Sequence, residues 1–157
     1  MQANQSDLDH LEWLKRAKIN SFSGLRLLDL GCGSGYICHK AAEWGAALAV
    51  GVDVVKPSGA GNGWTFQEVD LNAGHWHEAW DDPFDLILAF DIIEHLDSPF
   101  QFLSSCRSLL SKEGKIVITT PNVLSWERFY NPRGWSGVQD PQHKVLFTKY
   151  SLEFLLG

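Results

Sequence analysis

The amino-acid sequence predicts an α/β fold, a doubly wound parallel sheet with the strand order 3-2-1-4-5. Segments of strand character alternate with segments of helical periodicity along the chain. Four of the five strand segments are apolar throughout, which is typical of parallel strands covered on both faces. A loop with three alternating glycines follows the first strand. Right-handed crossovers between such strands give the doubly wound arrangement.

The strand segments are short runs of apolar or β-branched side chains bounded by turn residues. The predicted strands are residues 25–30, 46–52, 64–69, 84–90 and 115–120. The third run is shorter and more polar than the others, so we expect it at an edge of the sheet.

The helical segments repeat apolar side chains at a spacing of three and four residues. The predicted helices are residues 8–19, 35–44 and 99–110. Asp7 or Ser6 is the expected cap of the first helix, Gly45 ends the second, and Ser98 caps the third. Gly114 marks a turn before the last strand, and the residues after that strand are expected to form helices and loop.

Composition bounds the class of protein. A chain of 157 residues is the size of one domain, so residues 1–157 are expected to form a single unit. No apolar run is long enough to cross a membrane, and the polar N-terminus does not resemble a signal peptide. The three cysteines form no CxxC pair, which indicates buried free thiols and a cytoplasmic location. The net charge of −6 argues against a nucleic-acid partner.

The glycine loop predicts a ligand that lies against the backbone. Gly31, Gly33 and Gly35 alternate, which differs from the GxGxxG spacing of dinucleotide-binding loops, and no GK[ST] follows as in a phosphate-binding loop. Asp53 lies at the end of the second strand, where a carboxylate accepts hydrogen bonds from both hydroxyls of a ribose. Asp70 follows the third strand and is either an adenine-binding residue or an ordinary turn residue.

Five motifs in order resemble those of class I S-adenosylmethionine-dependent methyltransferases. They are LLDLGCGSG, VGVDVV, QEVDLNA, FDLILAFDIIEHLDSP and LLSKEGKIVITTPN. The later segments PNVLSWERFY and QHKVLFTKYSLEFLL resemble the branch that includes ubiquinone-biosynthesis O-methyltransferases and other small-molecule enzymes. The resemblance implies a Rossmann-like sheet, S-adenosyl-L-methionine as cofactor, S-adenosyl-L-homocysteine as product, and O-methylation of a small-molecule acceptor.

The resemblance also implies roles for individual residues. The implied cofactor-binding residues are Asp29, Gly31, Cys32, Gly33, Gly35, Asp53, Val54, Asp70, Leu71, Phe90 and Asp91. Asp29 and the glycine loop would hold the methionine part, with close passage at Gly35. Asp53 would hold the ribose and Val54 would face the adenine, whose edge Asp70 and Leu71 would read. Phe90 and Asp91 would line the sulfonium side.

Transfer to a hydroxyl needs a base with a pKa near neutrality, which is typical of histidine. His95 follows the fourth strand directly, and His143 lies in the segment expected to fold over the cleft, so these two are the candidate catalytic residues. An imidazole that only orders the backbone near the site is the alternative role of His95. His10 and His39 fall on predicted helices and are expected away from the site.

A divalent cation is an alternative that we do not favour, so no metal ligand is predicted. Asp91, Glu94 and His95 are spaced to share one face of a helical turn, and His143 would complete such a set. Relatives that bind a cation through a similar group have the longer glutamate at the first position. A second pair, His75 and His77, is expected to lie in a solvated turn.

The segment after the fifth strand supplies further candidates for acceptor binding. Its aromatic residues are expected either to pack as a lid or to line the acceptor site; they are Trp126, Phe129, Tyr130 and Trp135. Arg128 and Arg133 are candidates for binding an acceptor carboxylate or phosphate, with solvent exposure as the default.

Two other classes of function remain open from the sequence. An NAD-dependent oxidoreductase is weakly supported by a YxxxK pattern at Tyr36 and Lys40, which lies in the wrong helix for that chemistry. A non-catalytic S-adenosyl-binding module or a fragment is the other alternative, because the last two strands usual in the family are not found in this sequence. The fifth strand would then have an unpaired edge, which a homodimer would cover.

Overall fold

Five parallel strands form the centre of the structure, a computed structural model that describes residues 3–157. The strands lie in the order β3-β2-β1-β4-β5, so the predicted fold class and strand order are confirmed. Their bounds are Arg26–Leu30 for β1, Leu48–Asp53 for β2, Thr65–Glu68 for β3, Phe84–Phe90 for β4 and Leu110–Thr119 for β5. The polar strand β3 lies at one edge, as its composition predicts.

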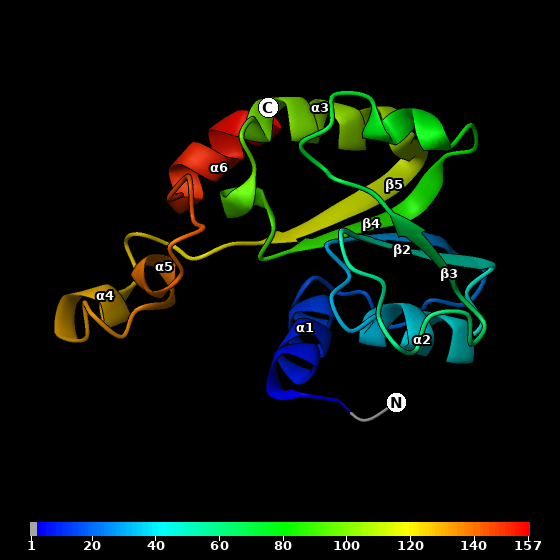
Figure 1. Ribbon diagram of the computed structural model, residues 1–157, viewed down its shortest axis with the longest axis horizontal. Helices are drawn as coiled ribbons and strands as arrows, with labels where there is room; N and C mark the ends of the chain where they lie inside the picture. Colours follow the sequence, from blue (N-terminus) through cyan, green and yellow to red (C-terminus); the bar gives the residue numbers. More distant parts are fainter. Residues whose placement is uncertain (1–2) are drawn as a thin grey trace.

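Helices cover both faces of the sheet (Figure 1). The helices α1 and α2 lie on one face, and α3 and α6 lie on the other. Their bounds are Gln5–Arg16 for α1, Tyr36–Glu43 for α2, Pro99–Leu109 for α3 and Lys149–Leu156 for α6. Each face has its own cluster of buried apolar side chains, which explains why the central strands carry almost no polar residues.

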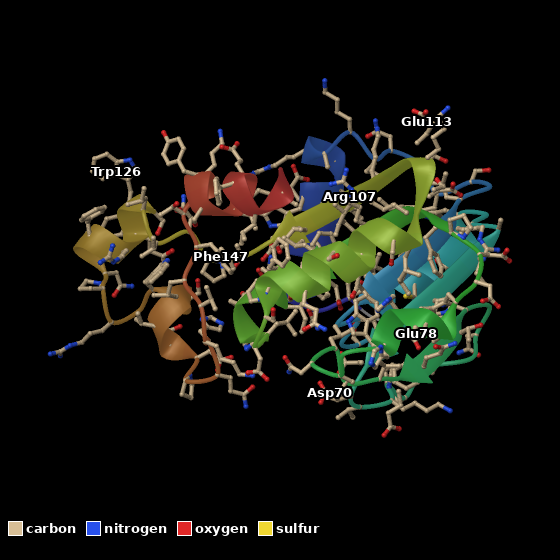
Figure 2. All side chains as sticks on the ribbon, turned by 90° about the horizontal axis from the view of Figure 1, so that it is seen from above. Asp70, Glu78, Arg107, Glu113, Trp126 and Phe147 are labelled. Atoms are coloured by element: carbon tan, nitrogen blue, oxygen red, sulfur yellow. The ribbon has the colours of Figure 1, made fainter. Side chains whose placement is uncertain are left out.

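Shorter helices lie in the connections. The 3-10 turns η1 and η2 span Trp76–Ala79 and Ile93–His95, and the helices α4 and α5 span Trp126–Tyr130 and Ser136–Gln139. The helix α4 stands away from the sheet, and the labelled Trp126 lies at the outer end of the molecule (Figure 2). After β5, residues 120–157 contain these helices, α6 and a single isolated bridge between Asn122 and Phe147, with no further strand.

The helix α1 begins earlier than the sequence predicts. Its cap is Asn4, whose side chain accepts a hydrogen bond from the Asp7 backbone N–H at 2.9 Å. The Asp7 carboxylate accepts in return from the Asn4 backbone N–H at 2.9 Å. The predicted caps, Asp7 and Ser6, are therefore wrong, because the reciprocal bonds of a capping box favour the residue three positions before Asp7.

The strand β5 also begins earlier than predicted, directly after α3. Gly114, which we expected in a turn, lies inside β5 near a register shift against β4. A side chain at Gly114 would lie 2.8 Å from the Phe84 carbonyl oxygen, so this irregular pairing requires glycine.

The glycine loop adopts a backbone that only glycine accepts readily. Gly31, Gly33 and Gly35 have φ angles of +77°, +50° and +75°. The N–H of Gly31 and that of Cys32 both donate to the carbonyl oxygen of Val52 at the end of β2, at 2.8 and 2.9 Å. The loop is thus fixed to the neighbouring strand before any ligand binds. No helix within residues 3–157 combines the length and apolar character needed to cross a bilayer.

Candidate functional site

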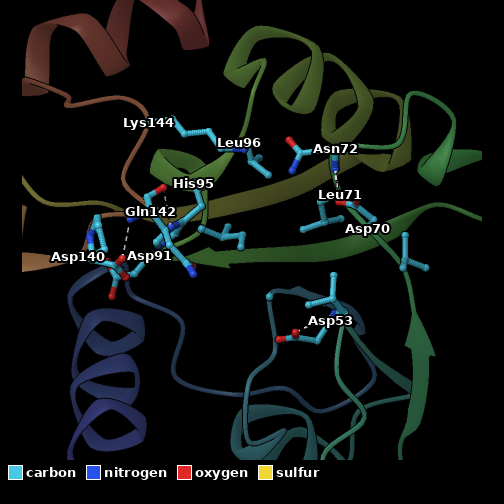
Figure 3. Close-up of a pocket in the computed structure, with 15 residues that line it drawn as sticks. Asp53, Asp70, Leu71, Asn72, Asp91, His95, Leu96, Asp140, Gln142 and Lys144 are labelled. Carbon is cyan, nitrogen blue, oxygen red and sulfur yellow. Dashed lines mark hydrogen bonds between the residues drawn. The ribbon is translucent and has the colours of Figure 1, made fainter.

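Two cavities adjoin at the carboxyl ends of the strands, where a doubly wound sheet binds its ligands. The first has a volume of about 650 Å³ and the second about 610 Å³. The two cavities share four lining residues, which are Asp91, His95, Asp140 and Pro141. In the first cavity, Asp53 lies opposite the group of Asp91, His95 and Gln142 (Figure 3). The shared residues form a boundary across which two bound molecules would meet.

Six of the predicted cofactor residues line the first cavity: Gly31, Asp53, Val54, Asp70, Leu71 and Asp91. The five others lie outside its lining: Asp29, Cys32, Gly33, Gly35 and Phe90. Sequence reasoning missed the hydrophobic wall made by Val69, Ile92 and Leu96, and the polar group of Asn72, Asp140, Gln142 and Lys144. Most of these residues follow a strand or lie in the loop between α5 and α6, and hydrophobic periodicity does not predict which loop residues face a cavity.

The Asp53 carboxylate is held by backbone N–H groups. One oxygen accepts from Gly33 at 2.9 Å and the other from Val54 at 2.7 Å. The oxygen bonded to Val54 also accepts from the Val55 N–H at 3.4 Å, so the oxygen bonded to Gly33 is the one with capacity for a further donor such as a ribose hydroxyl. Asp70 accepts from the Asn72 N–H at 2.9 Å and also lines the cavity, so the turn role and the binding role are compatible.

Asp29 lies behind the glycine loop, 3% exposed, in the middle strand of the sheet. Burial raises the pKa of its carboxyl group to about 7, although His10 and a 3.6 Å contact from the Cys38 thiol act in the opposite direction. Burial also raises the pKa of the Cys32 and Cys38 thiols well above the ordinary value. Both cysteines are free and buried, as predicted, and their raised pKa keeps them protonated.

The end of β4 is fixed by contacts from β5 and α1. Asp91 has a φ of +50°, an uncommon conformation for a residue with a side chain. Its N–H donates to the Thr119 carbonyl oxygen at 3.1 Å, and the Thr119 hydroxyl donates to the Asp91 carboxylate at 3.0 Å. His10 stacks on Phe90 with ring centroids 4.5 Å apart, and its Nε2 lies 3.7 Å from the Asp91 carboxylate. The expectation that His10 lies away from the site is therefore wrong.

His95 and His143, far apart in sequence, meet at the second cavity with ring centroids 4.7 Å apart. His95 Nδ1 lies 3.3 Å from the Gln142 carbonyl oxygen, and His143 Nδ1 lies 3.1 Å from that of Gly137. A carbonyl oxygen only accepts, so each Nδ1 is the donor, and in the neutral form of either ring Nε2 is then free as a base. The segment that carries His143 is fixed by Lys144 and Val145, whose N–H groups donate to the Glu94 carbonyl oxygen at 2.8 and 3.2 Å.

Glu94 lies beneath the two histidines and is 1% exposed. Burial raises the pKa of its carboxyl group, and both carboxyl oxygens lack a hydrogen-bond partner, with the nearer one 4.0 Å from His143 Nε2. Glu94, His95 and His143 each offer a ligand atom within 4.8 Å of the others, a spacing that a cation can bridge. Asp91 does not belong to this group, so the four-residue set considered from the sequence is wrong in that member.

The aromatic segment after β5 divides into a buried and an exposed part. Trp135 is buried, whereas Trp126 is 82% exposed. Phe129 and Tyr130 are also exposed, and none of these three exposed residues lines either cavity. Arg128 donates to the Val123 carbonyl oxygen at 2.9 Å and lines neither cavity. The aromatic residue that does line the second cavity is Trp13 of α1, which the sequence did not single out as a site residue.

Arg133 also lies outside both cavities. The other two histidines considered for metal binding lie outside both cavities; His75 is exposed, as expected for a solvated turn, whereas His77 is half-buried with an enclosed Nδ1. His75 pairs with Glu78 at 3.0 Å, and neither His75 nor His77 belongs to the group that could hold a cation. The Tyr36–Lys40 pattern lies in α2, where Lys40 pairs with Glu43.

Comparisons with known proteins agree with this arrangement. The sequence profile of a family described as "Methyltransferase domain" matches residues 5–156. A ubiquinone biosynthesis O-methyltransferase of Bradyrhizobium sp. (strain ORS 278) is 32% identical over 162 residues, which cover 86% of this chain and 59% of that protein. The chain thus spans about three-fifths of the length of this relative.

Solved structures have the same fold. A SAM-dependent methyltransferase from Archaeoglobus fulgidus is 28% identical with a TM-score of 0.76, covering 98% of this chain and 67% of that one. The magnesium protoporphyrin IX methyltransferase from Synechocystis PCC 6803, solved with bound SAH, is 20% identical with a TM-score of 0.64. The match covers 100% of this chain and 77% of the Synechocystis chain. The family match over nearly the whole sequence is decisive, and the chain belongs to the methyltransferase domain family.

Proposed function

We propose that this domain transfers a methyl group from S-adenosyl-L-methionine to an oxygen atom of a small molecule. The observation that carries the proposal is the boundary between the two cavities, formed in part by Asp91 and His95. A cofactor in the first cavity and an acceptor in the second would meet there, which is the alignment that an in-line displacement needs. The relative that is a ubiquinone biosynthesis O-methyltransferase supports oxygen as the target atom.

The first cavity has the chemistry that a nucleoside requires. Asp53 would accept from the ribose hydroxyls, and Asp70 with Leu71 would hold the adenine, with Val54 on its face. The methionine part would lie along Gly31 and the rest of the glycine loop, with its amino group toward the Asp29 side. S-adenosyl-L-methionine supplies a methyl group that is already activated on a sulfonium. The protein then has to orient the acceptor and remove its proton.

His95 is the proposed general base, because it lines both cavities and its neutral ring has Nε2 free. His143 would assist from the second cavity, where its own Nε2 faces Glu94. The buried carboxyl group of Glu94, whose nearer oxygen lies 4.0 Å from that nitrogen, would fix the His143 ring. His143 would thus orient the neighbouring His95.

The charge of the second cavity indicates the class of acceptor. Its lining contains the carboxyl groups of Asp91, Glu94 and Asp140, and no lysine or arginine from any described part of the chain. A carboxylate or phosphate on the acceptor would meet repulsion without a compensating cation. We therefore propose an uncharged small molecule with a phenolic or alcoholic hydroxyl, and no nucleic-acid partner.

Binding of S-adenosyl-L-homocysteine tests the proposal directly. We expect micromolar affinity by calorimetric titration, and no binding of NAD under the same conditions. Asp53→Ala should weaken binding by at least about tenfold, because it removes a charged acceptor for two ribose hydroxyls. A matched control is Asp82→Ala, a carboxylate at the far end of β4 that lines neither cavity. Binding of NAD in place of the nucleoside would overturn the proposal.

His95→Gln tests the proposed base. We expect the release of S-adenosyl-L-homocysteine with an uncharged catechol or phenol panel to fall by about 100-fold, with a much smaller loss of affinity for S-adenosyl-L-homocysteine, because His95 also lines the first cavity. The control is His75→Gln, because His75 is exposed and lies outside both cavities. Full activity of the His95 variant on an acceptor that the unaltered chain methylates would contradict this role.

The cluster of Glu94, His95 and His143 supports a second candidate for the same step, a divalent cation that binds the acceptor hydroxyl. The donor set fits such an ion, with two imidazole nitrogens and one carboxylate. Adding a chelator to the same assay distinguishes the two candidates. A base mechanism predicts unchanged turnover, whereas a cation mechanism predicts a loss that Mg²⁺ or Zn²⁺ restores.

A further inference from the structure

The helix α1 contacts the site at two places through polar side chains, in addition to its apolar packing on the sheet. At its first turn, Asp7 accepts a hydrogen bond from the hydroxyl of Ser34, in the glycine loop, at 2.9 Å. One turn further along, His10 reaches the end of β4, where it stacks on Phe90 and approaches Asp91. The helix therefore links the loop beside the first cavity to the boundary between the cavities.

The two oxygens of the Asp91 carboxylate have different neighbours. Thr119 donates to Oδ1 at 3.0 Å, and His10 Nε2 lies 3.7 Å from Oδ2. Burial acts to raise the pKa of this carboxyl group, but the contacts with His10 and Thr119 outweigh it and lower the pKa, so Asp91 is ionised at neutral pH. The side chain of Asp91 is still 55% exposed, whereas that of His10 is 19% exposed. His10, whose Nε2 also lies 3.4 Å from the Ser6 hydroxyl, is thus the more buried partner and adds a second neighbour to a carboxylate that Thr119 already holds by one oxygen.

We propose that His10 is a positioning residue, which holds the Asp91 carboxylate toward the sulfonium of the bound cofactor. This inference rests on the proposed function, because it requires the cofactor in the first cavity and the reacting atom at the boundary. A carboxylate beside a sulfonium stabilises the positively charged cofactor relative to the neutral thioether that remains after transfer. His10 and Asp91 together would thereby favour the binding of S-adenosyl-L-methionine over that of S-adenosyl-L-homocysteine.

The charge preference can be measured without knowing the acceptor. Sinefungin carries an amine on carbon in place of the methylsulfonium and is positively charged there, whereas S-adenosyl-L-homocysteine is neutral at that atom. The ratio of their affinities, measured by calorimetry, reports on the carboxylate. We expect His10→Phe to keep the stacking on Phe90 and to lower the sinefungin preference about fivefold, with the affinity for S-adenosyl-L-homocysteine within about twofold.

A double-mutant cycle shows whether His10 acts through Asp91. Asp91→Asn should lower the same ratio, and His10→Phe should have no further effect in that background. An unchanged ratio in His10→Phe would overturn the inference, as would equal weakening of both ligands or an independent effect in the double variant. Failure of the unaltered chain to bind S-adenosyl-L-homocysteine would instead overturn the proposed function, so the two failures are distinguishable.

Discussion

Gly35→Ala is expected to lower the free energy of unfolding by about 3 kcal/mol. A methyl group at this position would lie 2.5 Å from Cη2 of Trp64, well inside van der Waals contact. The ring is buried, and its Cζ3 also lies close to Gly51, where an added methyl group would be 2.7 Å away, so its movement is restricted. The residue that we expected to give the cofactor close passage thus has a packing requirement of its own.

A matched variant separates this clash from backbone strain. Gly24 has the same φ of +75° as Gly35, but nothing lies within 4 Å of an added methyl group. Gly24→Ala should therefore cost only the left-handed strain, about 1 kcal/mol. Urea unfolding of both variants measures the difference. Equal losses at the two positions would show that Trp64 yields to the added methyl group.

The second large effect is expected at Asp29, where replacement by asparagine should stabilise the chain at alkaline pH. Burial, the dominant cause, raises the pKa of this carboxyl group from 3.8 to about 7. In the unfolded chain the group ionises near pH 4, whereas in the folded chain it keeps its proton until about pH 7. A shift of about three pKa units corresponds to about 4 kcal/mol, which the folded state loses when Asp29 ionises.

The sign of the pH dependence follows from proton binding. Between pH 4 and pH 7 the folded state binds the proton and the unfolded state does not, so stability falls as the pH rises. The advantage of Asp29→Asn over the unaltered chain should therefore grow by about 3 kcal/mol between pH 5 and pH 8. Urea unfolding of both chains at the two pH values measures it. A constant difference between the chains would mean that Asp29 ionises at its ordinary pKa despite its burial.

The sheet could be predicted from the sequence because its signals are local. Apolar runs at residues 25–30 and 84–90 identify strands that are buried on both faces. A residue predicted to bind the cofactor directly follows each run, Gly31 in the first case and Asp91 in the second. Parallel strands end at the same rim, so the prediction also brings Asp53 and Asp91 together at one cavity. The order of the strands follows from the crossover rule and needs no knowledge of side-chain contacts.

The contribution of α1 could not be predicted in the same way. Helical periodicity shows which face of α1 is apolar, but not which part of the sheet that face covers. His10 and Trp13 lie at the rim because the helix starts at Gln5 under an Asn4 cap and crosses toward the end of β4. Arg128 is exposed on α4 and lines neither cavity, which agrees with the solvent exposure expected by default and not with the acceptor-binding role.

The segment from Gln139 to Gln142, which supplies Asp140 and Pro141 to the boundary between the two cavities, is held in place by main-chain atoms. Lys144 and Val145 attach it to the turn η2 through the carbonyl oxygen of Glu94, and any residue except proline can donate such bonds. The attachment of this segment therefore does not depend on its side chains, of which Gln139 lines the second cavity alone while Asp140 and Pro141 line both. Natural variants that differ at Gln139 should therefore diverge in the acceptor they choose and keep the cofactor, whereas changes at Asp140 or Pro141 should affect both.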